Sequence, residues 1–159
     1  MNWRMLPRVA ALIVGPTLLP ATASAQTVTV SVPASVTFNV TNVGADTVGS
    51  PAPTRVSFSG LLLLNVLRIS IKADAPTFTP PTPSPQSIPS SNVRWTVSNS
   101  SGGSGSNGTV SSAAWTQLFQ SAFLATNGRV DVTWRLGAPG GGIRAGSHTV
   151  TIRYKLEAM

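Results

Sequence analysis

RVDVTWRLGAPGGGIRAGSHTVTIRYKLE, residues 129–157, contains the two clearest strand patterns of the chain. Apolar side chains occupy every second position, at 130, 132, 134 and 136 in its first part and at 150, 152, 154 and 156 in its last. Strict alternation predicts β-strands with one buried face. Because only a Gly-rich connection separates the two runs, we expect them to pair antiparallel in one sheet. Asp131 lies among basic residues on the polar face, which predicts an exposed cross-strand ion pair.

The same alternation recurs along the rest of the chain. It predicts further strands in TVTVSV (27–32), SVTFNVT (35–41), TRVSFSG (54–60) and NVRWTVS (92–98), and a shorter one around TQLFQ (116–120). Residues 41–53 read as a turn, and SNSSGGSGSNG (98–108) reads as a flexible hairpin tip. The run GLLLLNVLRISIKAD (60–74) predicts a strand that is covered on both faces at its start, with a short helical turn over 61–66 as the alternative.

Six prolines fall within residues 74–91. Neither a helix nor a central strand tolerates this density, so we expect an extended crossover loop. An interdomain linker is the alternative, but the strands before it are too short to close a core of their own. Residues 26–159 are therefore expected to form a single domain. Its fold is expected to be all-β, an immunoglobulin-like β-sandwich of eight or nine mostly antiparallel strands. An inward-facing Trp95 resembles the buried tryptophan of immunoglobulin domains, although the chain has no cysteine.

The first 25 residues have the three regions of a secretory signal peptide. Arg4 and Arg8 precede an apolar run at 9–21, and Ala23 and Ala25 occupy the small-residue cleavage positions. Prolines interrupt the apolar run, which argues against a membrane anchor. We expect cleavage before Gln26 and a secreted, periplasmic or cell-surface product with no membrane span. A composition rich in Ala, Gly, Pro and Arg favours a bacterial source.

The sequence offers little catalytic chemistry. Removing Arg4 and Arg8 lowers the formal charge from +7 to +5, and the remaining basic residues are spread singly, which argues against a nucleic-acid partner. The one histidine, His148, is best explained as structural, because no metal-ligating or catalytic partners cluster near it in the sequence. The four acids are scattered. We therefore expect no enzyme activity, no catalytic residues, no cofactor and no metal.

Two non-enzymatic roles fit these features. The first is a structural or assembly subunit of the cell surface or of an extracellular polymer. In this role the uncharged 27–32 segment, with Val28, Val30 and Val32 on one face, pairs with its own sheet or with that of another copy or another surface protein. The alternative is a secreted module that binds carbohydrate or another surface ligand. Trp115, Gln117 and Gln120 would supply its platform, although the neighbouring Leu118 and Phe119 favour burial of Trp115.

Overall fold

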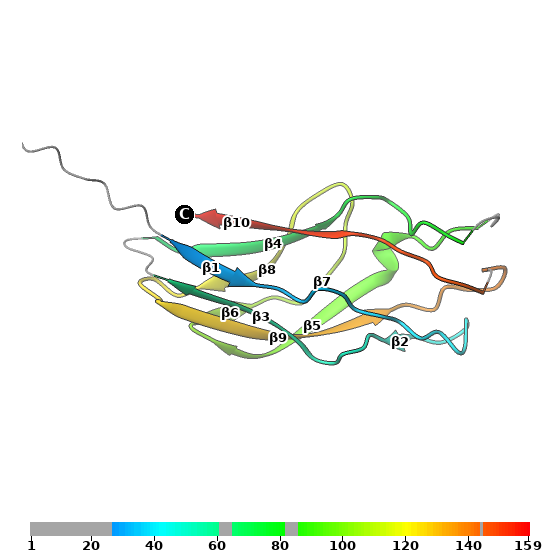
Figure 1. Cartoon of the computed structure of the whole chain (residues 1–159), viewed down its shortest axis with the longest axis horizontal. Coiled ribbons are helices and arrows are strands. Elements are labelled where there is room, and N and C mark those ends of the chain that lie inside the picture. The colour runs from blue at the N-terminus through cyan, green and yellow to red at the C-terminus, as the bar shows by residue number, and fades with distance from the viewer. Residues whose placement is uncertain (1–26, 61–64, 82–85, 144) are drawn as a thin grey trace, which may run out of the picture.

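The computed structural model describes residues 27–60, 65–81, 86–143 and 145–159. In this part the chain is all-β, and two antiparallel sheets pack face to face (Figure 1). The predicted signal peptide (1–25) and most of the possible helical turn at 61–66 lie outside the described residues. The strands are β1 (Val28–Ser31), β2 (Thr47–Val48), β3 (Thr54–Gly60), β4 (Leu67–Ala73), β5 (Val93–Ser101), β6 (Gly103–Gly105), β7 (Gly108–Thr109), β8 (Thr116–Ser121), β9 (Asn127–Leu136) and β10 (Ile152–Ala158).

The first sheet has the strand order β1-β3-β9-β5-β7, and β2 pairs with β9 beyond the end of β3. Its centre is β9, which pairs with β3 on one side and with β5 on the other. The predicted inward faces are confirmed: Val130, Val132, Trp134 and Leu136 of β9 are all buried. The alternation therefore predicted burial correctly for the apolar positions of this strand.

The second sheet has the strand order β10-β4-β8-β6. β4 pairs with β10 over seven residues, from Leu67 opposite Ala158 to Ala73 opposite Ile152. The inward residues of β4, Leu67, Ile69 and Ile71, are buried, as the odd positions of the run predicted. The expected pairing of the 129–136 and 150–157 strands is wrong, since β9 and β10 lie in different sheets. The connection after Leu136 is too long to act as a tight hairpin, so it crosses from one sheet to the other instead.

Two tryptophans lie at the centre of the core. Trp95 and Trp134 face each other across β5 and β9, with ring centroids 5.9 Å apart and an interplanar angle of 51°. The Trp95 indole donates a hydrogen bond to the Ser106 carbonyl, at 2.7 Å, and the Trp134 indole donates one to the Thr54 hydroxyl, at 2.9 Å. Burial of both rings was predicted from the strand patterns and is confirmed.

Two loop predictions need correction. The segment 98–108 is not a flexible tip, because β5 extends to Ser101 and β6 and β7 follow. Its glycines permit this close packing: a Cβ on Gly108 would lie 2.5 Å from the Trp95 ring, and a Cβ on Gly103 would lie 2.2 Å from the Gln120 carbonyl oxygen. The Pro-rich crossover does not lie wholly on the surface, since its residues Phe78 and Ile88 are buried in the core.

The segment 35–41 is not a full strand. It forms one antiparallel bridge, from Thr37 to Ser50, although Val36, Phe38 and Val40 do pack against the core as the alternation predicted. Prolines directly after Ser50 interrupt the partner segment and prevent a longer ladder. No helix in the described part of the chain is long and apolar enough to span a membrane.

Candidate functional site

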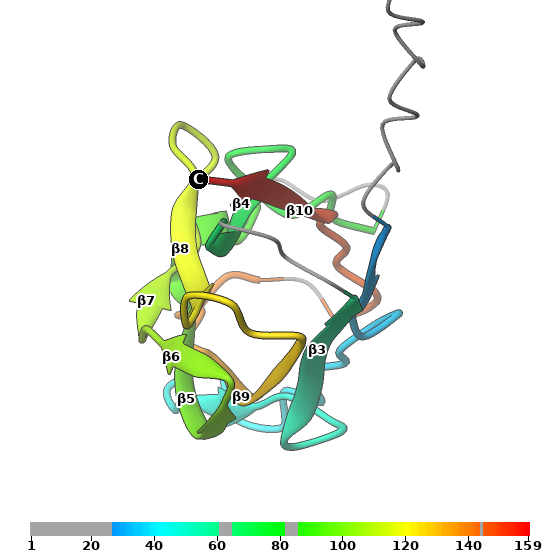
Figure 2. The same ribbon diagram turned by 90° about the vertical axis from the view of Figure 1, so that its left-hand side faces the viewer.

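One side of the sandwich is bounded by two strand edges that do not pair with each other. Viewed along the sandwich, β1 and β10 lie on the same side, while β6 and β7 lie on the opposite side (Figure 2). In the described part of the chain, β1 pairs with β3 alone and β10 pairs with β4 alone. Each sheet therefore ends here in a strand with one unpaired edge.

Each edge continues beyond its strand. After β1, the segment 33–40 extends the edge of the first sheet, held by the two hydrogen bonds that Thr37 exchanges with Ser50. Before β10, the segment 148–151 extends the edge of the second sheet, held by the two hydrogen bonds that Thr149 exchanges with Thr79. Among the described residues, no strand pairing or bridge joins the two sheets along this side.

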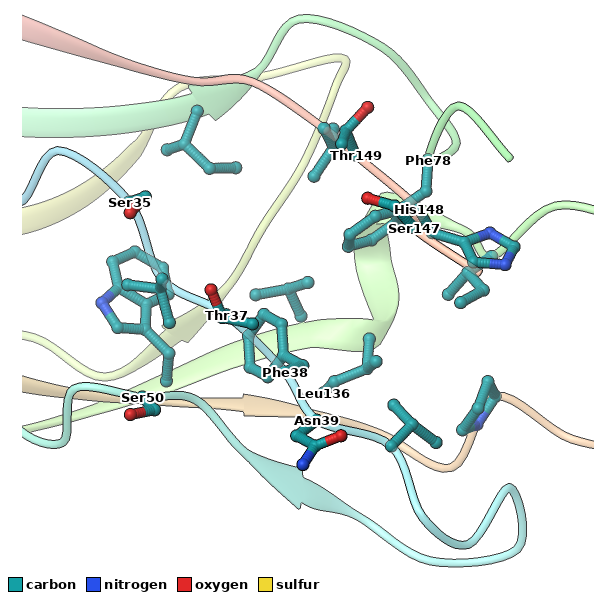
Figure 3. Close-up of a pocket in the computed structure, with 18 of the residues that line it drawn as sticks. Ser35, Thr37, Phe38, Asn39, Ser50, Phe78, Leu136, Ser147, His148 and Thr149 are labelled. Carbon is teal, nitrogen blue, oxygen red and sulfur yellow. The ribbon is translucent and has the colours of Figure 1, made fainter. Parts of the chain in front are cut away.

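A cavity of about 1300 Å³ lies between these edge segments (Figure 3). The segment before β10 that borders it lies toward the end of the sandwich opposite the C-terminus (Figure 1). We call the cavity and its two lips, residues 35–40 and 148–154, the edge slot. Its floor consists of buried core residues such as Phe78, Trp134 and Leu136. Its lips carry half-buried apolar side chains at alternating positions: Val36, Phe38 and Val40 on one lip, and Val150, Ile152 and Tyr154 on the other. Burial raises the pKa of Tyr154 to about 12, so its phenol is neutral at physiological pH.

The lining contains no Asp, Glu, Lys or Arg among the described residues. His148 is part of the lining and is half-buried, so the structure places the chain's one histidine in a cavity lined by apolar and uncharged polar side chains. The slot was not predicted from the sequence. The alternation identified the apolar positions on both lips, but it gave no sign that the two lips stay apart.

The main chain of both lips has free hydrogen-bonding groups. On extended backbone, the groups of successive residues point to opposite sides, so those of Val36 and Phe38 point away from Ser50 and those of Val150 point away from Thr79. Within the described residues, none of these three forms a backbone–backbone hydrogen bond. Each lip is therefore an open β-edge as well as an apolar surface.

The predicted shared segment forms β1 and lies in its own sheet. Val28 and Val30 are half-buried against the core, opposite Gly60 and Phe58 of β3, whereas Val32 lies beyond the strand and is exposed. Only four residues are paired. The structure of one chain places this segment on its own β3, and exchange between copies stays a prediction.

The predicted ligand platform lies on the outer face of the second sheet, away from the slot. Gln117 and Lys155 both pair with Ser70, from opposite sides, and Gln120 pairs with Arg68 in the next row. Trp115 is 39% exposed, so the expectation that it is buried is wrong. The Lys155 ammonium lies 5.3 Å from the centre of the Trp115 ring, a cation–π distance. Trp115 lies just before β8 begins, which is why its burial does not follow the strand pattern.

The acidic residues are held by structural contacts at separate places. Asp46 pairs with Arg94, Glu157 pairs with Lys155 at 2.9 Å, and the Asp74 carboxylate accepts a hydrogen bond from the Thr151 amide. No three His, Asp or Glu side chains come together as a metal site within the described residues.

The Asp131 ion pair differs from its prediction in partner and in exposure. Asp131 pairs with Arg55, directly opposite on β3, with the guanidinium Nε 2.8 Å from the carboxylate, and is only 4% exposed. It also accepts a hydrogen bond from the Asn99 side chain at 3.0 Å. The hydrogen bonds from Arg55 and Asn99 lower the pKa of Asp131 from 3.8 to about 2. The arrangement is a structural clamp between β3, β5 and β9.

Comparison with known proteins adds no relative: no family model matches the chain, and no curated protein is similar to it in sequence.

Proposed function

We propose that residues 26–159 form an exported, non-enzymatic subunit of a bacterial cell-surface structure or extracellular polymer, and that its copies assemble by strand pairing. In this proposal residues 1–25 are a signal peptide, and the sandwich is of immunoglobulin-like type. The charged start, apolar middle and small residues before Gln26 support export. Two face-to-face antiparallel sheets with Trp95 in the core support the fold type.

The observation that carries this proposal is the contrast between the two strand edges. Soluble proteins usually protect an edge strand with charged side chains, prolines or bulges. β10 has such protection, since Arg153, Lys155 and Glu157 alternate along it. β1 has the sequence VTVS, with no charge and no proline, and it is held on one side by four residue pairs. An unprotected edge strand readily joins a sheet of another molecule.

Carbohydrate binding is the second candidate. The exposed Trp115 ring favours it, together with the Gln117 and Gln120 side chains on the same outer face. Replacement of Trp115 by Ala should then abolish binding on a glycan array while the urea midpoint stays unchanged. Identical array profiles for the two proteins would exclude this role.

Replacement of Val30 by Lys tests the assembly role. The experiment measures the mass of the exported protein in solution by light scattering over a range of concentrations, and the mass of the chain also tests cleavage before Gln26. We expect the original protein to form multimers and Val30→Lys to remain monomeric, because a charge in the shared strand opposes pairing.

A control separates assembly from stability. Val97 of β5 is also half-buried, but it lies on an interior strand, so Val97→Ala should lower stability without preventing assembly. If the original protein stays monomeric at every concentration, and Val30→Lys only unfolds at lower urea, the assembly role must be abandoned.

A further inference from the structure

We propose that the edge slot is the acceptor site for residues 27–32 of a second copy of the chain. This inference rests on the proposed assembly function and identifies its partner. It places the donor strand and the acceptor site on different parts of the surface, so each copy can donate one strand and receive another.

The chemistry of the slot sets the first requirement for its occupant. The lining has buried Phe78, Trp134 and Leu136 at its floor and half-buried apolar side chains on its lips, with uncharged polar residues such as Thr37 and Thr149 between them (Figure 3). It has no Asp, Glu, Lys or Arg among the described residues, so we expect an uncharged occupant with one apolar face. A charge placed there would lose its hydration without gaining a partner. Its volume of about 1300 Å³ exceeds the roughly 300–1,000 Å³ that is usual for small-ligand sites, which favours an extended occupant.

The main chain of the lips sets the second requirement. The backbone groups of Val36 and Phe38 on one lip, and of Val150 on the other, make no backbone–backbone hydrogen bond with any residue that the structure describes. These groups lie on extended chain at the spacing of a β-ladder, and a peptide strand satisfies them while an acyl chain does not. The slot therefore fits a strand better than a lipid.

Residues 27–32 meet both requirements. The segment TVTVSV has no charge and places valine at every second position, so one face is apolar. Six extended residues span about 20 Å, close to the length of the six- and seven-residue lips. The other uncharged strand of comparable length, β8, is fixed between β4 and β6, whereas β1 is a half-buried edge strand. Release of β1 from β3 thus disturbs the donor least.

The mode of association follows from this placement. The donor strand and the slot are different surfaces, so the contact is heterologous and leaves a free slot at one end and a free strand at the other. Such contacts generate rings or open filaments. An extending polymer is consistent with the proposed structural role.

A synthetic peptide tests the slot directly, because it does not need to leave a parent sheet. A fluorescent peptide of residues 26–33, QTVTVSVP, is titrated into the mature protein, and anisotropy reports binding. A second peptide, QTTSVVVP, has the same composition without alternation. A third retains the sequence but carries N-methyl groups at alternate residues, which remove backbone donors and leave the side chains intact. We expect saturable binding of the first and about tenfold or more weaker binding of the other two.

Two protein variants locate the binding site. Val150→Lys places a charge on a lip of the slot, and Val48→Lys makes the same change at an exposed position on β2 outside the lining. Val150→Lys should weaken peptide binding about tenfold or more, and Val48→Lys should leave it unchanged. If Val150→Lys does not fold, the comparison of the three peptides on the unmodified protein still tests the slot.

The outcomes separate this inference from the proposed function. If the protein forms multimers but none of the peptides binds, or all three bind equally, the slot is not the acceptor and the assembly role stands. If a fluorescent fatty acid binds the slot and the 26–33 peptide does not displace it, the strand assignment is overturned. If the peptide binds as expected to a protein that never forms multimers, the slot is supported and the assembly role fails.

Discussion

Truncation of the two core tryptophans should destabilise the domain strongly and unequally. Trp95→Ala removes a ring that is 1% exposed, and it leaves the Ser106 carbonyl without the indole donor. Large-to-small changes of this kind cost about 3 to 5 kcal/mol, and loss of the donor to the half-buried Ser106 carbonyl adds about 1 kcal/mol, the low end of the range for an unsatisfied acceptor. We therefore place Trp95→Ala at about 5 kcal/mol. Trp134→Ala also removes a donor, from the buried Thr54 hydroxyl, but Trp134 borders the open slot, so water can enter the vacated space and bond that hydroxyl. We therefore place Trp134→Ala lower, at about 3 kcal/mol.

Urea unfolding followed by circular dichroism measures these losses. With a slope of about 1.5 kcal/mol per molar urea, the midpoint should fall by about 3 M for Trp95→Ala and by about 2 M for Trp134→Ala. Trp115→Ala is the matched control, because the same change at an exposed ring should shift the midpoint by about 0.5 M or less. Equal midpoints for all three variants would refute the assigned faces. A larger loss for Trp134→Ala than for Trp95→Ala would refute the argument from the cavity.

Two further predictions concern the ion pair and the glycines. Asp131→Asn should destabilise the protein at neutral pH, because the pKa of Asp131 is lower in the folded state than its ordinary value of 3.8. The ionised carboxylate therefore stabilises the folded state above pH 3.8, and this stabilisation is lost as the pH falls toward about 2. The difference in urea midpoint between Asp131→Asn and the original protein should therefore close over that pH interval, and a difference that does not change with pH would contradict the clamp by Arg55. Gly108→Ala should cost about 1 to 3 kcal/mol, because its new methyl group meets the Trp95 ring, whereas Gly141→Ala, in open space, should change stability by about 0.5 kcal/mol or less. Equal melting temperatures for the two alanine variants would show that the packing around Gly108 is looser than the structure indicates.

Alternation predicted the faces of the strands well, because a strand with one buried side requires an apolar residue at every second position. Trp95, Val130 and Ile71 are buried as expected. The same pattern carries no information about which strand lies beside which. β9 and β10 have the clearest patterns in the chain, yet they belong to different sheets, because both can bury an apolar face against the same core from opposite sides.

Side chains outside the strands followed no such rule. Trp115 precedes β8, so its exposure depends on where the strand begins and not on its apolar neighbours. The Asp131 partner was missed for a related reason. Arg55 lies 76 positions away in the chain, and only the antiparallel register of β3 against β9 brings the two residues opposite each other.

The edge slot shows what a burial pattern alone does not report. Val36, Phe38, Val150 and Tyr154 all follow the alternation of core residues, but they are half-buried because the two lips do not close on each other. Closing such an opening would stabilise the folded monomer, since each apolar side chain stabilises the folded state in proportion to the area that it removes from water. The open slot and the unprotected β1 edge lie on the same side of the sandwich. A strand from another copy would bury the apolar side chains of the slot, and the β1 segment of that copy could be this strand. Partial burial of alternating residues along both lips is thus the pattern expected of a sandwich that is completed by its neighbour.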